Sequence, residues 1–224
     1  MHKSVPRWSR RKLARPAELT AAALALFVEH GYAATRLDDV AAAAGVSKGT
    51  LYLYFESKEA LFKAVVREGL VSVLERGERA LAEHRGSSFS LLTDLMWAWW
   101  ELIGSQPISG LAKLMFSECR NFPELAQFYH DEVISRGHRI IEAALARGMH
   151  SGEFRRADLA LTARLVCAPQ MMFSIWRHSF QACEAQPVDP QTYIRQHLDL
   201  MSRALLAQPG AHLAASAAEQ EFGV

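Results

Sequence analysis

A cluster of hydroxyl, ammonium and phenol groups lies between residues 47 and 58. Small and polar residues stand where a helix is expected to begin, and the free N–H groups of such a helix start favour a phosphate. Phenol and ammonium groups also bond phosphate oxygens, and an aromatic ring can contact a thymine methyl. The pattern therefore predicts contact with a nucleic-acid backbone; the alternative is core tyrosines behind an ordinary helix cap. The residues are Ser47, Lys48, Gly49, Thr50, Tyr52, Tyr54 and Lys58.

These groups need a pair of short helices to hold them, and the preceding residues predict a helix-turn-helix. One helix is expected from about residue 37 to 44, and a second from about 47 to 55. Ala41 allows the two helices to touch, and Gly45 supplies the turn with a positive φ that costs glycine little. The first side chains of the second helix would then enter a major groove. The core between the helices is expected to contain Val40, Ala44, Val46 and Leu51.

Helical periodicity continues along the rest of the chain, and no segment alternates as a strand does. The prediction is an all-α fold of about nine helices in two packed groups. The expected segments are a flexible basic arm (1–15), a three-helix domain (16–60), a helical body (61–207) and a frayed tail (208–224). The later helices are expected near 58–84, 89–104, 108–119, 121–149, 158–183 and 190–207.

The charge is unevenly distributed along the 224 residues, although the formal net charge is only +1. Residues 1–58 contain nine Lys or Arg and five Asp or Glu, so the remaining body is slightly acidic. A basic end on an acidic body is expected when that end meets phosphate. The first fifteen residues can follow a DNA backbone or minor groove, or serve as a solubilising tail.

The stretches Gly31–Thr35 and Leu37–Leu61 resemble the DNA-binding domain of the TetR/AcrR family. The resemblance is close over about residues 16–66 and only architectural beyond them. It implies a homodimeric repressor whose N-terminal domain (16–60) binds a palindromic operator in double-stranded DNA. The body (61–207) would then bind a small-molecule effector and dimerise.

Position by position, the resemblance implies DNA contacts by Thr35 and by the residues of the 47–58 cluster. Thr50 would lie near base edges, whereas Tyr52, Tyr54 and Lys58 would hold phosphates. Leu53 would contact a thymine methyl. Arg36 departs from the small hydroxyl residue common at its position, and would bind phosphate or point into the groove. Asp38 can accept a hydrogen bond from cytosine N4, or these charges form a solvated ion pair.

Large, soft side chains concentrate between residues 89 and 183, where the family houses its effectors. Met and Trp side chains suit a pocket wall, and the alternative is an ordinary core. Two carboxylates among them would anchor a cationic ligand, while a neutral, apolar ligand is expected if both face solvent. The expected pocket consists of Met96, Trp97, Trp100, Glu101, Met115, Glu118, Phe128, Met172 and Trp176.

The last two long helices carry more apolar residues than one subunit needs, which predicts dimerisation through a four-helix bundle. A twofold axis would present two recognition helices to successive major grooves. The apolar residues concerned are Leu165, Met172, Ile175, Ile194, Leu198, Met201 and Leu205.

Two other classes of function have some support in the sequence. A metal-dependent enzyme would use Tyr129–Glu132 with His138 and Glu142, but no third-ligand spacing completes a site, so no metal, cofactor or catalytic residue is expected. A thiol-based redox regulator would use Cys119, whose neighbour Arg120 can lower its pKa. Three cysteines without CxxC spacing, no signal peptide and no long early apolar run predict a cytoplasmic protein that does not span a membrane.

Overall fold

The computed structural model describes residues 7–207, with side chains from Arg15 onward, and this part of the chain is all-helical. It forms nine helices, as predicted, three of which contain a π-helical turn and one of which begins with a 3-10 turn. The first three are α1 (Arg7–His30), α2 (Leu37–Ala43) and α3 (Lys48–Tyr52). The fourth runs continuously through α4 (Lys58–Val66), η1 (Arg67–Val71) and α5 (Ser72–Glu83).

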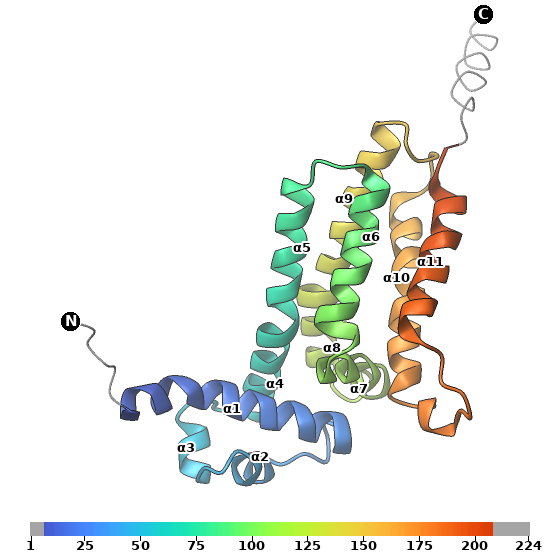
Figure 1. Ribbon diagram of the computed structural model, residues 1–224. Helices are drawn as coiled ribbons and strands as arrows, with labels where there is room; N and C mark the ends of the chain where they lie inside the picture. The colour runs from blue at the N-terminus through green and yellow to red at the C-terminus, as the bar shows by residue number, and fades with distance from the viewer. Residues whose placement is uncertain (1–6, 208–224) are drawn as a thin grey trace, which may run out of the picture.

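The body contains the remaining five helices. They are α6 (Ser88–Trp99) with η2 (Trp100–Gly104); η3 (Pro107–Ser109) with α7 (Gly110–Glu118); α8 (Pro123–Tyr129), η4 (His130–Ile134) and α9 (Ser135–His150); α10 (Leu159–Arg177); and α11 (Pro190–Leu205). Figure 1 shows α1 crossing the foot of this body with α2 and α3 beneath it. In the same view α5 and α11 lie on opposite sides.

Two predicted boundaries require correction. The backbone is already helical from Arg7, so residues 7–15 are not the predicted flexible arm; Pro16 lies inside α1. Helix α10 ends at Arg177 rather than near 183, because the chain turns at His178 and a short 3-10 segment, η5 (Gln181–Cys183), follows. Residues 1–6 and the predicted frayed tail lie outside the described residues.

The buried side chains form two cores. The first joins α1–α4 to α7 and α8, and at its centre the rings of Phe27, Tyr32 and Phe62 lie 5.5–5.7 Å apart. The second core lies between α5, α6, α9, α10 and α11. Because α7 and α8 contribute to the first core, the three-helix unit is packed into the body rather than tethered to it.

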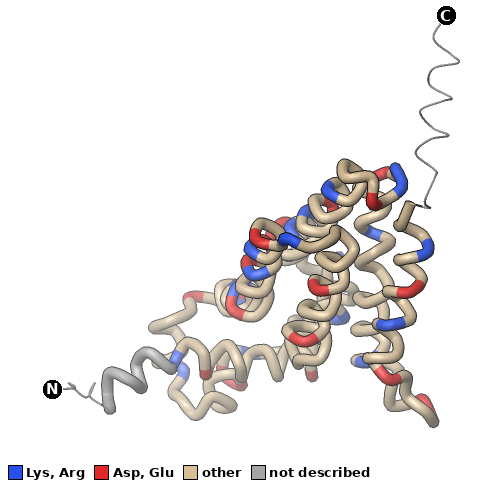
Figure 2. Tube along the Cα trace, turned by 45° about the horizontal axis from the view of Figure 1, so that its top comes forward, with Lys and Arg blue, Asp and Glu red and all other residues tan. Residues whose placement is uncertain are grey.

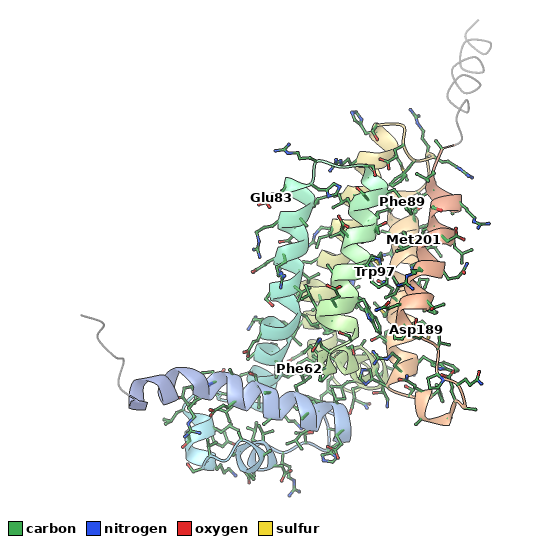
Figure 3. All side chains as sticks on the ribbon, in the orientation of Figure 1. Phe62, Glu83, Phe89, Trp97, Asp189 and Met201 are labelled. Atoms are coloured by element: carbon green, nitrogen blue, oxygen red, sulfur yellow. The ribbon has the colours of Figure 1, made fainter. Side chains whose placement is uncertain are left out.

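The helix over 58–83 connects the two ends of the molecule. The Ser57 hydroxyl caps its start by accepting a hydrogen bond from the Ala60 N–H at 3.0 Å. Figure 3 labels Phe62 close to α1 and Glu83 at the far end of the same helix. The predicted domain boundary at residue 60 therefore falls inside a continuous helix.

Candidate nucleic-acid interface and ligand cavity

The turn between α2 and α3 has the geometry that its sequence predicts. Gly45 has φ +65°, a region that favours glycine. The Val46 N–H donates to the Ala41 carbonyl at 2.9 Å and closes the turn. Val40, Ala41 and Leu51 are buried between the helices. This is a helix-turn-helix, with α3 in the position of the recognition helix.

The outer side of α3 is exposed. The Ser47 side chain caps the helix, accepting from the Thr50 N–H at 3.1 Å. Lys48 and Gly49 are exposed as well, whereas Thr50 is half-buried. Tyr52 is 46% exposed and Leu53 83%, an unusual exposure for a leucine. Tyr54 is half-buried and packs against the first core, so its ring is less available than that of Tyr52.

The side chains of Thr35 and Lys58, which the sequence assigned to DNA contacts, are engaged inside the domain. Thr35 is buried, and its hydroxyl lies 2.7 Å from the Gly31 carbonyl oxygen. The Lys58 ammonium donates to the carbonyls of Tyr32 (2.7 Å), Thr35 (2.9 Å) and Ala33 (3.1 Å). These bonds use all three ammonium protons and close the loop that follows α1. Burial lowers the Lys58 pKa.

The charges at the entrance to α3 form a different pair from the one anticipated. Asp38 pairs with Lys48, whose Nζ lies 2.8 Å from a carboxylate oxygen, and this hydrogen bond raises the pKa of Lys48. Both side chains are more than half exposed, so the pair can open to solvent or to DNA. The Arg36 side chain is exposed and makes no hydrogen bond or ion pair within the described residues.

The body encloses a cavity of about 710 Å³ between α5, α6, α7, α9 and α10, with contributions from α8. Its wall is predominantly apolar. All three π-helical turns contribute to it, through Leu70, through Leu102 and Ile103, and through Val133 and Ile134. Such turns occur frequently at functional sites. The volume and apolar lining are those of a site for one drug-sized or larger ligand.

Few polar groups face this cavity. Tyr129, Gln170 and Ser174 are buried, and His138 is half-buried. Burial raises the pKa of Tyr129 and lowers that of His138, which keeps both groups neutral near neutral pH. Exposed Arg76, Arg79 and Glu83 of α5 and exposed Asp94 of α6 also line the cavity. The two arginines form no ion pair within residues 7–207.

Only two residues of the expected pocket, Met96 and Met115, line the cavity. Trp100 is buried, but its ring lies against Phe173 (5.6 Å between centroids) and below the Arg177 guanidinium (5.0 Å). Trp97 packs into the second core, and Figure 3 labels it on α6.

The other expected pocket residues lie elsewhere. Glu101 is exposed, and a Glu118 carboxylate oxygen accepts from the Ala33 N–H at 3.4 Å. Phe128 lies below the cations of Lys63 and Arg67, 5.5 and 5.1 Å from them. Met172 and Trp176 lie on the outer face of α10, 58% and 41% exposed. Neither carboxylate is therefore an anchor inside the cavity.

The pocket prediction was wrong about the face of α6. This helix is apolar on most of its circumference, so periodicity alone does not choose between neighbouring faces. The stripe Leu95, Trp99 and Leu102, spaced by four and three residues, faces the cavity, while Trp100 faces Phe173. Gln170 and Ser174 were not predicted to line the cavity. Their spacing, two polar residues one turn apart in an apolar helix, could have indicated it.

The residues named for the two other classes of function can be located in the described part of the chain. Among residues 7–207 no three His, Cys, Asp or Glu side chains are placed to hold a metal ion. His130 pairs with Asp131 at 2.9 Å. Burial raises the pKa of the Cys167 thiol to about 12, which keeps it protonated, whereas Cys119 is half-buried and Cys183 is exposed.

A helix-turn-helix packed onto a helical body with an apolar cavity defines a class of transcriptional regulators. Residues 19–65 match the family model described as bacterial regulatory proteins, tetR family. Residues 90–205, more than half of the chain, match the model described as AefR-like transcriptional repressor, C-terminal domain. The chain belongs to the TetR family of transcriptional regulators.

Relatives of known name extend over different parts of the chain. The fatty acid metabolism regulator protein of Bacillus subtilis is 27% identical over 146 residues, 65% of this chain and 74% of its own length. The repressor KstR2 of Mycolicibacterium smegmatis is 29% identical and aligns with 66% of this chain and 72% of its own length. The regulator RutR of Escherichia coli is 44% identical over 66 residues, 30% of this chain and 31% of its own.

Solved structures share the fold. FadR, a fatty acid degradation regulator from Bacillus halodurans, superposes with a TM-score of 0.70 at 20% identity, covering 89% of this chain and 96% of its own. FadR from Bacillus subtilis, solved with stearoyl-CoA, gives 0.66 at 22% identity, covering 83% and 97%. PfmR from Thermus thermophilus gives 0.68 at 27%, covering 84% and 99%.

Proposed function

We propose that this protein is a homodimeric repressor released from a palindromic operator by an effector with a long, apolar acyl chain. The observation that carries the proposal is the continuous helix over 58–83. Its first turns pack against α1 through Phe62, and its later turns line the cavity through Leu70, Val73 and Leu74. A ligand that displaces the cavity wall therefore acts on the helix that positions the DNA-binding domain.

The exposed face of the helix-turn-helix supports fewer DNA-contact residues than the sequence predicted. Thr50 and Leu53 face base edges, while Lys48, Tyr52 and Arg36 bind phosphates. Lys58 and Thr35 shape the loop behind them. In the described part of the body, basic and acidic residues are interspersed along the trace (Figure 2). The repressor interpretation also agrees with the matched C-terminal family model.

The proposed dimer interface is a stripe along the outer face of α10. Leu161, Leu165, Met172 and Trp176 are spaced by four, seven and four residues and are 41–72% exposed. This spacing places them on one side of the helix. Ile194, Leu198, Met201 and Leu205, expected in the interface, are instead buried in the subunit's own core, which leaves Leu200, 58% exposed, on α11.

Helix α10 is the one helix within the described range that is long and apolar enough to cross a membrane. One such helix is weak evidence for a membrane span, and the stripe accounts for its exposed apolar side chains. We place the protein in the cytoplasm, where its operator would be accessible.

The proposed effector class is a long acyl chain joined to an anionic, phosphate-bearing group, as in stearoyl-CoA. The cavity is apolar along most of its wall, and unpaired Arg76 and Arg79 stand at its edge, where they can bind phosphates. The FadR relative was solved with stearoyl-CoA. A cationic effector, also expected from the sequence, loses support because Glu101 and Glu118 do not line the cavity.

The test uses an operator selected from random DNA and fluorescence anisotropy. Stearoyl-CoA is expected to lower operator affinity of the full chain, whereas acetyl-CoA is not. Ala112→Phe, which fills the cavity, should keep DNA binding and lose the response; Ala82→Phe, on the exposed side of α5, is its matched control. Operator binding that stearoyl-CoA leaves unchanged would refute this effector class, and failure to select any operator would refute the DNA-binding function.

A further inference from the structure

Two polar residues of α10 line the cavity one helical turn apart. Gln170 is 2% exposed and Ser174 is 1% exposed, and both line the cavity wall. Residues four apart on a helix lie side by side on one face. They form a polar pair in a wall that is otherwise apolar on this side of α10, where Cys167 and Met171 are the other lining residues.

The pair has unused hydrogen-bonding capacity. The Gln170 Nε2 donates to the Met96 carbonyl at 3.2 Å, which fixes the carboxamide so that its Oε1 is left as an acceptor. The Ser174 hydroxyl is buried without a hydrogen-bond partner in the described structure. Buried polar groups are nearly always paired, so an unpaired hydroxyl at the wall of a ligand cavity indicates a partner on the ligand.

We infer that the effector carries a hydroxyl group on its buried, apolar part, and that this hydroxyl binds Gln170 and Ser174. A ligand hydroxyl can donate to the Gln170 Oε1 and accept from the Ser174 hydroxyl, so one group satisfies both. The ligand class is a hydroxylated long-chain acyl thioester rather than a plain saturated one. The inference rests on the proposed function, since it concerns the same cavity and the same acyl effector.

Specificity follows from the polar pair. A site built to hydrogen-bond a ligand hydroxyl rejects the analogue without it, because the polar groups of the site are then left unpaired. The position of the hydroxyl along the acyl chain is set by the distance of Gln170 and Ser174 from the cavity entrance. Only one or two positional isomers are therefore expected to gain affinity.

The experiment titrates the full chain with stearoyl-CoA and a panel of hydroxystearoyl-CoA isomers, using tryptophan fluorescence. Trp99 lines the cavity and supplies the signal. At least one isomer is expected to bind about tenfold or more tightly than stearoyl-CoA. In Ser174→Ala this advantage should disappear while the affinity for stearoyl-CoA is retained. The matched control is Ser72→Ala, at the start of α5 outside the cavity wall, where the hydroxyl donates to the Glu68 carbonyl of η1; it should behave as wild type.

Loss of stability is not expected to affect the test. Ser174→Ala removes an unpaired hydroxyl, so its melting temperature should equal or exceed that of the wild type. Equal binding of stearoyl-CoA and every isomer overturns the inference and leaves the proposed function standing. An isomer preference that persists in Ser174→Ala overturns the assignment to this pair. If no thioester binds and none releases the operator, both the inference and the proposed effector class fail.

Discussion

The Lys58 ammonium donates a hydrogen bond to the Tyr32 carbonyl at 2.7 Å and lies 4.6 Å from the centre of the Tyr32 ring. The same nitrogen bonds two more carbonyls of the loop after α1. In this structure, Lys58, which the sequence assigned to a DNA phosphate, therefore links the start of the long helix to the loop that follows α1. Gly31, at φ +87°, ends α1 and lets the loop turn toward it.

Replacing Lys58 by methionine is expected to destabilise the fold. The variant keeps most of the side-chain stem but leaves three loop carbonyls without their donor, and hydrogen bonds to charged groups are worth about 1.5–3 kcal/mol. The free energy of unfolding should fall by about that amount, measured by urea denaturation followed by circular dichroism. Wild-type stability combined with a large loss of DNA affinity would instead restore Lys58 to a direct phosphate contact.

Arg36 should show the opposite behaviour. It is exposed and unpaired within the described residues, so Arg36→Ala is expected to change the free energy of unfolding by no more than about 0.5 kcal/mol. Operator affinity should fall, and the slope of log K against log salt should shrink by about 0.9 for each phosphate that the variant no longer neutralises.

The matched control for Arg36 is Arg85→Ala, which removes the same charge from an exposed position just beyond α5. It should bind the operator with nearly unchanged affinity and salt slope. Equal losses in both variants would show that Arg36 acts only through the net charge of the protein.

The lowered pKa of His178 predicts how the stability of the fold depends on pH. The Ser109 hydroxyl donates to the Gln106 carbonyl at 2.7 Å, so it accepts from the His178 Nε2–H, also at 2.7 Å. Burial, with help from the neighbouring Arg177 and Lys113 charges, lowers the His178 pKa below 6.5. The unfolded chain therefore takes up a proton that the folded protein resists, and stability falls as the pH drops through 6.5.

His178→Asn should weaken this pH dependence but not remove it, because burial also lowers the pKa values of His138 and His197. Urea midpoints measured between about pH 8 and about pH 5.5 would show the difference. His150→Asn, at an exposed position at the end of α9, should retain the wild-type profile. A His178→Asn profile that follows wild type across this range would contradict the assignment.

The helix-turn-helix could be predicted from sequence because its determinants are local. Gly45 must adopt a positive φ, Ser47 caps the helix that it precedes, and Val40 and Leu51 meet over a short stretch of chain. The role of Lys58 depends on backbone carbonyls more than twenty residues away, which no side-chain pattern reveals. The sequence around Lys58 therefore indicates a phosphate contact but gives no sign of its bonds to this loop.

The cavity could be anticipated but not mapped. A concentration of Met and Trp pointed to the correct region, yet the identity of the lining depends on how five helices rotate about their axes. Met96 and Met115 face inward, while Met172 lies outside on α10. Apolar side chains on the outside of a helix and on a cavity wall look alike in sequence, because both lie beside a surface that the subunit's core does not fill.

That outer face of α10 yields the remaining prediction. Leu165 is 72% exposed at the centre of the stripe formed with Leu161, Met172 and Trp176. In a symmetric interface each substitution acts twice, and a carboxylate placed in an apolar contact must be desolvated without a partner. Leu165→Glu is therefore expected to convert the dimer to a monomer, measured by light scattering after size exclusion, with little loss of helix content.

The monomer should also lose operator binding, because a single helix-turn-helix reaches only one half-site. Leu53→Glu provides the reciprocal control, since Leu53 is also a highly exposed leucine but lies at the end of α3 rather than on α10. It should remain dimeric and lose DNA affinity through the recognition helix itself. A Leu165→Glu protein that stays dimeric would move the interface away from α10, whereas a monomer with full operator affinity would show that dimerisation and DNA recognition are independent.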